Sequence, residues 1–307
     1  MTGRPAIDTF HERIPMSRLH LPALLLTILA LLLTTPRPAQ AAQSYDNCTG
    51  FITTLPTIIS TQGTWCLKQD LATSISSGNA ITINTNNVTI DCNDFKLDDS
   101  AAGTATTAYG IYELNRNNAA VRHCNIRGFY AGVYFDGVNG GGHSVEDNLL
   151  DRNTILGIEV YGDGSVIQRN RVVDTGGTTF SPTITTANGI DSVGTVDLID
   201  NLISGATATS GHNGSAYGMY IYGNVAGRIV GNRIRGLKKD GSGIDYGIVL
   251  NSGTHVAVRD NELVGDASTG SLGIQCAAAA VDIRGNMLSG FAIGNSGCVD
   301  NGNDIVP

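Results

Sequence analysis

The chain has 307 residues, of which 19 are basic and 27 are acidic, and its formal net charge is −8. This excess of acids argues against a nucleic-acid partner, because phosphate contacts need clustered Lys and Arg side chains. The length is compatible with a single all-β solenoid or barrel domain that follows a leader segment.

The N-terminal segment has the features of a secretory signal peptide. Residues 21–35 form an apolar run that follows Arg13 and Arg18, and the small-residue site at 39–41 fits the A-x-A cleavage pattern. A single-pass membrane anchor is the alternative, although the run is short for one. Cleavage would remove four Arg and two acids, which leaves 265 residues with a net charge of −10. We expect a secreted or periplasmic protein with no membrane span after cleavage.

A repeat of one Gly and one Asn dominates the chain after its first hundred residues. The Gly members, each followed by an apolar residue, are Gly110, Gly132, Gly157, Gly189, Gly218, Gly247 and Gly273. Their partners are Cys124, Asn148, Asn170, Asn201, Asn232, Asn261 and Asn286. The separation within a pair is 12 to 16 residues, whereas the distance to the next Gly varies from 8 to 19. A constant half and a variable half are typical of a strand solenoid with insertions at one corner.

The segments around each Asn predict short β-strands. SVEDNLL, SVIQRNRVV and VDLIDNLIS each combine an aliphatic strand, a bend at Asn and a second strand. Asn tolerates the left-handed backbone of a tight bend, and its amide can bond to the Asn residues of neighbouring coils. Connections between parallel strands are right-handed. The expected fold is all-β: a single-stranded, right-handed parallel β-helix with an N-terminal cap.

These units, G-I/V-x-x followed by V-x-x-x-N-x-I/L, resemble those of the right-handed parallel β-helix superfamily, the pectin-lyase-like fold, over residues 64–300. The resemblance implies this fold. Members include pectate and alginate lyases, polygalacturonases, mannuronan epimerases, phage tailspikes and noncatalytic surface proteins, so it does not imply one activity. The polygalacturonase set N-T-D, D-D, G-H-G and R-I-K is not assembled, and the epimerase-type D-P-H-D tetrad is absent from the sequence.

Three segments are expected: a signal peptide over residues 1–42, a cap over 43–63 and the β-helix over 64–307. Translation could start at Met1 or at Met16. The oligomeric state stays open.

All six cysteines follow the expected signal peptide, and an even number suits an oxidising compartment. Cys92 and Cys124 both end a Val-rich strand and precede Asn. They are therefore expected at one corner of adjacent coils, where a strand spacing of about 4.8 Å permits a disulfide. Cys276 and Cys298 lie about one coil apart at the C-terminal end, and Cys48 and Cys66 bracket the N-terminal segment. We predict the disulfides Cys48–Cys66, Cys92–Cys124 and Cys276–Cys298; the alternative is that some cysteines are only small buried residues.

Alternation along the strand opened by each Gly sends the next residue into the core. These core residues are Ile111, Val133, Ile158, Ile190, Met219, Ile248 and Ile274. The following position faces solvent in a first outward column: Tyr112, Tyr134, Glu159, Asp191, Tyr220, Val249 and Gln275. Two residues further lies a second outward column: Leu114, Asp136, Tyr161, Val193, Tyr222, Asn251 and Ala277.

Aromatic rings beside carboxylates in these columns suit a sugar chain, whose C–H faces stack on rings while its hydroxyl groups form hydrogen bonds. We predict a polysaccharide as the partner. The predicted substrate-binding residues are Tyr112, Tyr134, Asp136, Tyr161, Tyr222, Asp245 and Gln275. The alternative is that Tyr, which has a high strand propensity, only covers a solvated sheet.

Glu159 and Asp191 share a column on adjacent coils, so their Cα atoms should lie about 4.8 Å apart. Two carboxyl groups this close do not both ionise easily. One pKa should rise, which would provide the acid and the base or nucleophile of a glycoside hydrolase. The alternatives are that the acids are merely tolerated or that they hold a cation.

The three longest variable segments follow Asn170, Asn201 and Asn232 on consecutive coils. We expect them to form a wall of loops beside the carboxyl pair. In a lyase acting on uronic acids, Lys238 with Tyr220 or His212 could abstract the proton and stabilise the enolate. The alternative is that Lys238 and His212 lie in exposed turns.

No metal or cofactor is expected, because the His residues lack the spacing of a zinc site. Calcium is possible at the acidic run of residues 91–99, although this run lacks the regular spacing of a calcium loop. The leading hypothesis is a glycan-binding β-helix, with polysaccharide lyase and glycoside hydrolase as the enzyme classes to test. The alternatives are a noncatalytic surface or adhesion protein and a purely structural solenoid.

Overall fold

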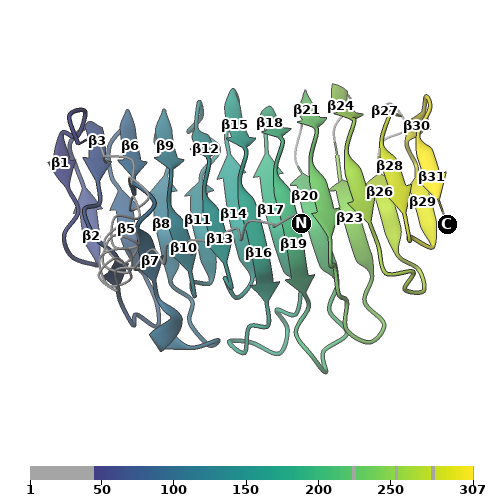
Figure 1. The fold of residues 1–307 in the computed structure, drawn as a ribbon, viewed down its shortest axis with the longest axis horizontal. Helices are drawn as coiled ribbons and strands as arrows, with labels where there is room; N and C mark the ends of the chain where they lie inside the picture. Colours follow the sequence, from purple (N-terminus) through teal and green to yellow (C-terminus); the bar gives the residue numbers. More distant parts are fainter. Residues whose placement is uncertain (1–44, 223–225, 253–254, 278–280, 307) are drawn as a thin grey trace, which may run out of the picture. The chain divides into compact units, whose positions relative to one another are not determined.

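The computed structural model describes residues 45–222, 226–252, 255–277 and 281–306. Three parallel sheets run through this part of the chain, and successive strands along the chain enter the three sheets in turn (Figure 1). The expected all-β parallel β-helix is confirmed. The expected signal peptide, residues 1–42, lies outside the described residues.

Sheet A carries the strands that end just before the Asn corner. Its described strands are β1 (Gly50–Phe51), β3 (Gly63–Cys66), β6 (Val88–Asp91), β9 (Ala119–Arg122), β12 (Ser144–Glu146), β15 (Ser165–Gln168), β18 (Val196–Ile199), β21 (Ala226–Val230), β24 (His255–Arg259), β27 (Asp282–Arg284) and β30 (Val299–Asp300).

Sheet B carries the strands that contain the repeated Gly. Its described strands are β2 (Thr57–Ile59), β5 (Asn79–Ile83), β8 (Tyr109–Leu114), β11 (Ala131–Asp136), β14 (Leu156–Tyr161), β17 (Ala187–Val193), β20 (Ala216–Tyr222), β23 (Asp245–Leu250), β26 (Leu272–Cys276) and β29 (Ile293–Ser296).

Sheet C carries the short strands that follow the Asn corner. Its described strands are β4 (Leu71–Ala72), β7 (Lys96–Asp98), β10 (Asn125–Arg127), β13 (Leu149–Asp151), β16 (Arg171–Gly176), β19 (Leu202–Thr207), β22 (Arg233–Arg235), β25 (Glu262–Val264), β28 (Met287–Ser289) and β31 (Asp304–Val306). A single 3₁₀ turn, η1 (Ser100–Ala102), follows β7 in the described chain. The segment expected as a cap, residues 43–63, contributes β1 to the edge of sheet A and β2 to the edge of sheet B.

The core residue after each repeated Gly is in register from coil to coil. Ile111, Val133, Ile158, Ile190, Met219, Ile248 and Ile274 pair in that order, and each is fully buried. The Gly residues also face the core. A Cβ atom on Gly189 would lie 2.6 Å from the carbonyl oxygen of Gly218 and 2.7 Å from Ile203. Gly is therefore required here by close packing between coils.

The Asn residues form a buried ladder where sheet A turns into sheet C. The Oδ1 atom of Asn201 accepts the backbone N–H of Asn170 at 3.0 Å and its side-chain amide at 3.1 Å. Its own amide donates to the Ile167 carbonyl at 2.9 Å and to the Oδ1 atom of Asn232 at 3.0 Å. The same pattern joins Asn148, Asn170, Asn201, Asn232, Asn261, Asn286 and Asn303.

The expectation that the Asn itself is left-handed is wrong. The positive φ belongs to the preceding residue, as in Asp147 (56°), Arg169 (54°) and Asp200 (54°). The Asn side chain must point inward to hydrogen-bond along the ladder, so the residue before it makes the bend. Asp supports this conformation well, and Gly takes the position at Gly231 and Gly285.

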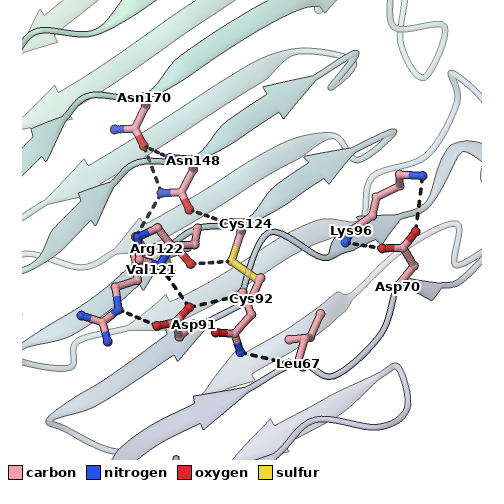
Figure 2. Close-up of a disulfide and its surroundings, with 12 residues drawn as sticks. Leu67, Asp70, Asp91, Cys92, Lys96, Val121, Arg122, Cys124, Asn148 and Asn170 are labelled. Atoms are coloured by element: carbon pink, nitrogen blue, oxygen red, sulfur yellow. Dashed lines mark hydrogen bonds and ion pairs between the residues drawn. A yellow bond between two sulfur atoms is a disulfide. The ribbon is translucent and has the colours of Figure 1, made fainter. Parts of the chain in front are cut away.

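The three predicted disulfides are confirmed. Their Cα–Cα distances are 5.8 Å for Cys48–Cys66, 4.7 Å for Cys92–Cys124 and 5.1 Å for Cys276–Cys298. Figure 2 shows the central disulfide at the start of the Asn ladder, where the N–H of Cys124 donates to Asn148 at 2.9 Å. The disulfide therefore occupies the corner position that Asn fills in later coils.

Long loops gather where sheet C turns into sheet B, along the lower edge in Figure 1. Residues 177–186, 208–215 and 236–244 form three successive loops of this kind. The first reaches back to the loop after η1, since the N–H of Thr179 donates to the Thr104 carbonyl at 2.9 Å. The next is tied to it, because the Thr209 hydroxyl donates to the Thr178 carbonyl at 3.1 Å. The expected wall of stacked loops is present at this corner.

A buried Glu–His pair interrupts the apolar core. Glu113 is inward-facing on β8 and fully buried, and its Oε1 atom lies 3.3 Å from Nε2 of His143. Its Oε2 atom accepts the N–H of Arg116 at 2.8 Å. Burial raises the pKa of Glu113 to about 7, and burial lowers the pKa of His143 to about 4. Both groups therefore disfavour their charged forms inside the protein.

Replacing Glu113 with Gln should make the protein more stable than wild type, and this difference should be larger at pH 8 than at pH 5. An acid whose pKa is raised on folding is ionised first in the unfolded chain, so wild-type stability falls as pH rises from the unfolded value of 4.5 to about 7. Gln avoids this loss. Urea titrations should show a stability difference between Glu113→Gln and wild type that grows by about 2 kcal/mol from pH 5 to pH 8. A difference independent of pH would show that the carboxyl is normally solvated.

Candidate functional site

The two outward columns predicted from the sequence lie on the outer face of sheet B. The first runs in register through Tyr112, Tyr134, Glu159, Asp191, Tyr220, Val249 and Gln275. In the second column, Tyr161, Val193 and Tyr222 are in register on β14, β17 and β20. We call this surface the tyrosine–acid face.

Glu159 and Asp191 are directly paired on β14 and β17, in the middle of this face. Although they belong to the outward column, only 5% of Glu159 and 6% of Asp191 is exposed. The Tyr222 hydroxyl donates to Oε1 of Glu159 at 2.7 Å. The Tyr161 and Tyr222 hydroxyls are themselves 2.8 Å apart, so two tyrosines from β14 and β20 meet beside this carboxyl group.

The two carboxyl groups have different surroundings. Asn188 donates to Oδ2 of Asp191 at 2.8 Å, whereas the buried Oδ1 atom of Asp191 has no hydrogen-bond partner among the described residues. Burial, with a smaller contribution from the charge of Glu159, holds the pKa of Asp191 well above its usual range. Burial also raises the pKa of Glu159, but the Tyr222 and Tyr161 hydroxyls counteract this rise. Asp191 is therefore the better proton holder, and Glu159 is the better anion.

Apolar side chains also pack on the outer face of sheet B. A small cluster separate from the main core contains Ala131, Ile155 and Leu156. Ile184, from the first long loop, packs against it together with Tyr109, Tyr130 and Tyr134. The loop at 177–186 thus contributes directly to the tyrosine–acid face.

Sequence reasoning missed a third row of tyrosines on the same face. Tyr109, Tyr217 and Tyr246 precede a repeated Gly. The Tyr109 ring lies 4.6 Å from the Tyr134 ring, and the Tyr217 and Tyr246 rings stack at 4.9 Å with an angle of 5°. Because both the Gly and the residue after it face the core, the residue before the Gly must face outward. The signal was the dipeptide Tyr-Gly, which occurs at each of these positions.

Burial raises the pKa of Tyr109 to about 12, with further contributions from neighbouring tyrosines and acids. Burial likewise raises the pKa of Tyr134 and of Tyr222, and for both the charge of Glu159 is the next cause. These hydroxyl groups stay protonated and act as hydrogen-bond donors. None of them is suited to abstract a proton at neutral pH.

The loop residues predicted for catalysis make contacts within the loop wall. The N–H of His212 donates to Asp240 at 2.7 Å, and its Nδ1 atom lies 2.8 Å from the Ser210 carbonyl. Lys238 is exposed, and its backbone pairs with Ala206 and Ala208. The contacts described for His212 and Lys238 do not include Tyr220, which faces Asp191 and lies 5.2 Å from the ring of Tyr217. Their catalytic roles remain predictions.

Asp245 begins β23 but is 1% exposed. Its Oδ2 atom accepts the Ser268 hydroxyl at 2.5 Å, and burial raises its pKa. The described contacts of Asp245 are thus with the loops before and after β23. Its predicted role in substrate binding is not supported by any contact with the tyrosine–acid face.

The acidic run considered for calcium is engaged with the protein. Asp91 pairs with Arg122 at 2.8 Å, and Asp99 accepts the N–H of Ile75 at 2.9 Å. Within the described ranges, no three His, Cys, Asp or Glu side chains are grouped as metal ligands. Calcium binding here remains an expectation without a described ligand set.

Positive charge is missing from the tyrosine–acid face. Along its three outward rows between β8 and β26, all of them in the described chain, no Lys, Arg or His is present. The charged residues there are Asp136, Glu159 and Asp191. An anionic sugar would meet acids alone on this surface.

The chain matches no protein-family model and no curated protein. Among solved structures it is similar to DFA-IIIase from Arthrobacter chlorophenolicus A6 in complex with GF2, at 14% identity and a TM-score of 0.44 over 76% of this chain and 61% of that chain. It is also similar to a tailspike protein mutant of E. coli bacteriophage HK620 in complex with a hexasaccharide, at 11% identity and a TM-score of 0.46 over 83% of this chain and 54% of that chain. A third similar structure is that of alginate lyase from Paenibacillus sp., at 12% identity and a TM-score of 0.42 over 80% of this chain and 88% of that chain.

This chain spans about half to six tenths of the first two proteins. The likenesses concern the course of the backbone and say nothing about the chemistry of this chain. No helix among the described residues is long and apolar enough to cross a membrane.

Proposed function

We propose that this protein binds a glycan along the tyrosine–acid face and hydrolyses a glycosidic bond at Glu159 and Asp191. One observation carries the proposal: two register-paired carboxyl groups lie on an outward face, yet both are almost completely buried, with the Tyr161 and Tyr222 hydroxyls beside Glu159. Burying two acids side by side without a described basic partner costs stability, so a catalytic role accounts for their presence better than tolerance does.

The two carboxyl groups take different parts in the proposed reaction. Asp191, protonated on Oδ1, donates its proton to the glycosidic oxygen as the bond to the leaving sugar breaks. Glu159, whose ionised form is favoured by the Tyr222 hydroxyl, attacks the anomeric carbon. Paired strands lie about 4.8 Å apart, close to the carboxyl separation of about 5–5.5 Å that retaining glycosidases use. Water then releases the sugar from Glu159, and Asp191 recovers the proton.

The same face argues against the lyase hypothesis. A lyase needs a base for the proton beside the uronate carboxylate and a cation for the enolate. The tyrosines here have raised pKa values, and the outward rows carry no basic side chain. A polyuronate would therefore be repelled where the proposed chemistry takes place.

We further propose that the protein acts outside the cytoplasm. Three disulfides in a chain of this size favour an oxidising compartment. The signal-peptide features at residues 1–42 support export, and sequencing the N-terminus of protein recovered from the periplasm or medium would test it.

The function is tested by incubating the protein that starts at residue 43 with neutral, amino and uronate polysaccharides. New reducing ends should appear without the ultraviolet absorbance of an unsaturated product. That absorbance would instead support elimination. Binding without either signal would indicate a noncatalytic glycan-binding protein. Absence of binding would indicate that the tyrosines only cover the outer face of the sheet.

A further inference from the structure

We propose that Asp136 is a specificity-determining residue that selects amino sugars, by accepting a sugar ammonium group beside the carboxyl pair. This inference rests on the proposed glycan-binding function and deepens it. Asp136 ends β11, two residues after Tyr134, which is in register with Glu159. It thus lies one coil from the proposed catalytic pair and on the same face.

The surroundings of Asp136 suit a cation. Asp136 follows Tyr134 by two residues on β11, and its charge contributes to the raised pKa of the Tyr112, Tyr134 and Tyr161 hydroxyls. The Tyr112 and Tyr134 rings are 6.1 Å apart and nearly parallel, at 10°. An ammonium group within about 6 Å of a ring is attracted by the ring face. Aromatic rings around an acid form a common type of ammonium site.

The Asp136 carboxylate is only partly buried and has no described ion pair or side-chain hydrogen bond. Most other acids of the chain that face outward in sheet strands have an Arg or amide partner, as in Asp197 with Arg228 at 2.7 Å and Glu262 with Arg233 at 2.7 Å. An acid left without a partner on a face without basic residues is available to a cationic ligand.

A second observation points to a ligand on this face. The Oδ1 atom of Asp191 is buried and lacks a partner within the described structure, so a bound molecule is expected to complete its hydrogen bonding. A divalent metal ion does not fit, because calcium takes six to eight oxygen ligands and no group of three acids or His is assembled among the described residues. An ammonium ion needs only one carboxylate and the ring faces.

The charge balance favours an amino sugar over a neutral one. Three acids lie within three consecutive strands, β11, β14 and β17, with no basic residue in the outward rows. Burial makes ionisation of the pair unfavourable, and a nearby positive charge offsets this cost. A neutral sugar does not offset this cost, and the negative charge of a uronate increases it.

The test uses two series of tetrasaccharides in which members differ only at C2. One is the β-1,4-gluco series and the other the α-1,4-galacto series, each with an amino, an N-acetylamino and a hydroxyl member. Calorimetry on the full mature chain with Glu159→Gln, to prevent turnover, should give an affinity about tenfold higher for the amino member of one series than for its hydroxyl member. Adding Asp136→Asn should reduce this ratio to about one, and Asp136→Glu should largely keep it.

Asp174→Asn is the matched control, because Asp174 is an exposed acid of sheet C and the change in net charge is the same. It should leave the affinity ratio unchanged. If neither amino member binds more tightly than its hydroxyl member, the inference is overturned. Tight binding of a neutral member alone would overturn it while keeping the proposed function, whereas no binding of any glycan in the wider panel would remove both. A ratio that survives in Asp136→Asn would assign the selectivity to other residues.

Discussion

Replacing Glu159 with Gln is expected to lower kcat for glycan hydrolysis by roughly 10³-fold while leaving the fold intact. Gln is close to Glu in size and keeps an oxygen that can accept the Tyr222 hydroxyl. In the wild-type protein this hydroxyl lies 2.7 Å from Oε1 of Glu159. It cannot carry the negative charge that the proposed step needs at the anomeric carbon. KM should change little, because the tyrosine rings proposed to hold the sugar are untouched. The measurement is the initial rate of reducing-end release at saturating glycan.

The partner residue should behave as part of one unit with Glu159. Asp191→Asn removes the proposed proton donor, so its kcat should fall by a similar factor. The double variant should be little worse than either single one, because the residues of one catalytic unit are not additive. Glu262→Gln on sheet C, where Glu262 pairs with Arg233, is the control and should keep wild-type rates. Wild-type turnover in Glu159→Gln would contradict the proposed mechanism.

The loss of activity should be accompanied by a gain in stability. Burial raises the pKa of both carboxyl groups on folding, so each contributes most to stability when protonated, and this contribution is lost as pH rises above the unfolded value. Glu159→Gln removes one source of that loss. Its free energy of unfolding should exceed that of wild type at pH 8, and the difference should shrink as pH falls toward 4. Activity and stability that fell together would instead indicate damaged packing.

The repeat in the sequence was sufficient to place residues that depend on coil register. Parallel strands stack position on position, so Ile158 over Ile190 and Glu159 beside Asp191 follow from aligning the Gly residues. The disulfide between Cys92 and Cys124 could be predicted for the same reason, because both hold the same corner position in adjacent coils. In a solenoid, residues at equivalent positions of successive repeats are neighbours in space, so the repeat alone predicts these contacts.

The direction of side chains within one coil was harder to predict. Strict alternation places a repeated Gly on the outside, but the strand bends there and both Gly and the next residue face the core. This departure concealed the row of Tyr109, Tyr217 and Tyr246. Regular alternation after Ile111 does place Glu113 inward, where other coils carry Phe135 or Val160, but its pairing with His143 could not be predicted from the repeat.

The burial of the outward acids could not be predicted from the repeat. Glu159 and Asp191 face outward in the sheet, yet only 5% and 6% of them is exposed. The Tyr222 hydroxyl reaches Glu159 from β20, two strands away, and no periodic pattern specifies how such side chains pack. For the same reason the sequence suggested roles for His212 and Asp245 that their described contacts, with Asp240 and Ser268, do not support.

Replacing Asn201 with Ala should lower the free energy of unfolding by about 3–5 kcal/mol, the largest stability effect we expect from a single ladder residue. The four side-chain hydrogen bonds of Asn201 are buried, with lengths between 2.9 and 3.1 Å. Ala leaves the N–H of Asn170 and the Ile167 carbonyl without these partners at a buried position. The measurement is urea unfolding followed by far-UV circular dichroism, with Asn139→Ala, at an exposed turn, as the control.

The position of Trp65 makes this experiment sensitive to how the coils depend on one another. It is the only Trp of the chain and lies on β3, so its fluorescence reports the first coils, whereas circular dichroism reports all of them. If the ladder joins the coils into one cooperative unit, both signals should shift together in Asn201→Ala. If each coil is stabilised mainly by its nearest neighbours, the fluorescence midpoint should move less than the dichroism midpoint. A shift below about 1 kcal/mol in both signals would mean that neighbouring backbone groups replace the lost amide, which the burial of Asn170, Asn201 and Asn232 argues against.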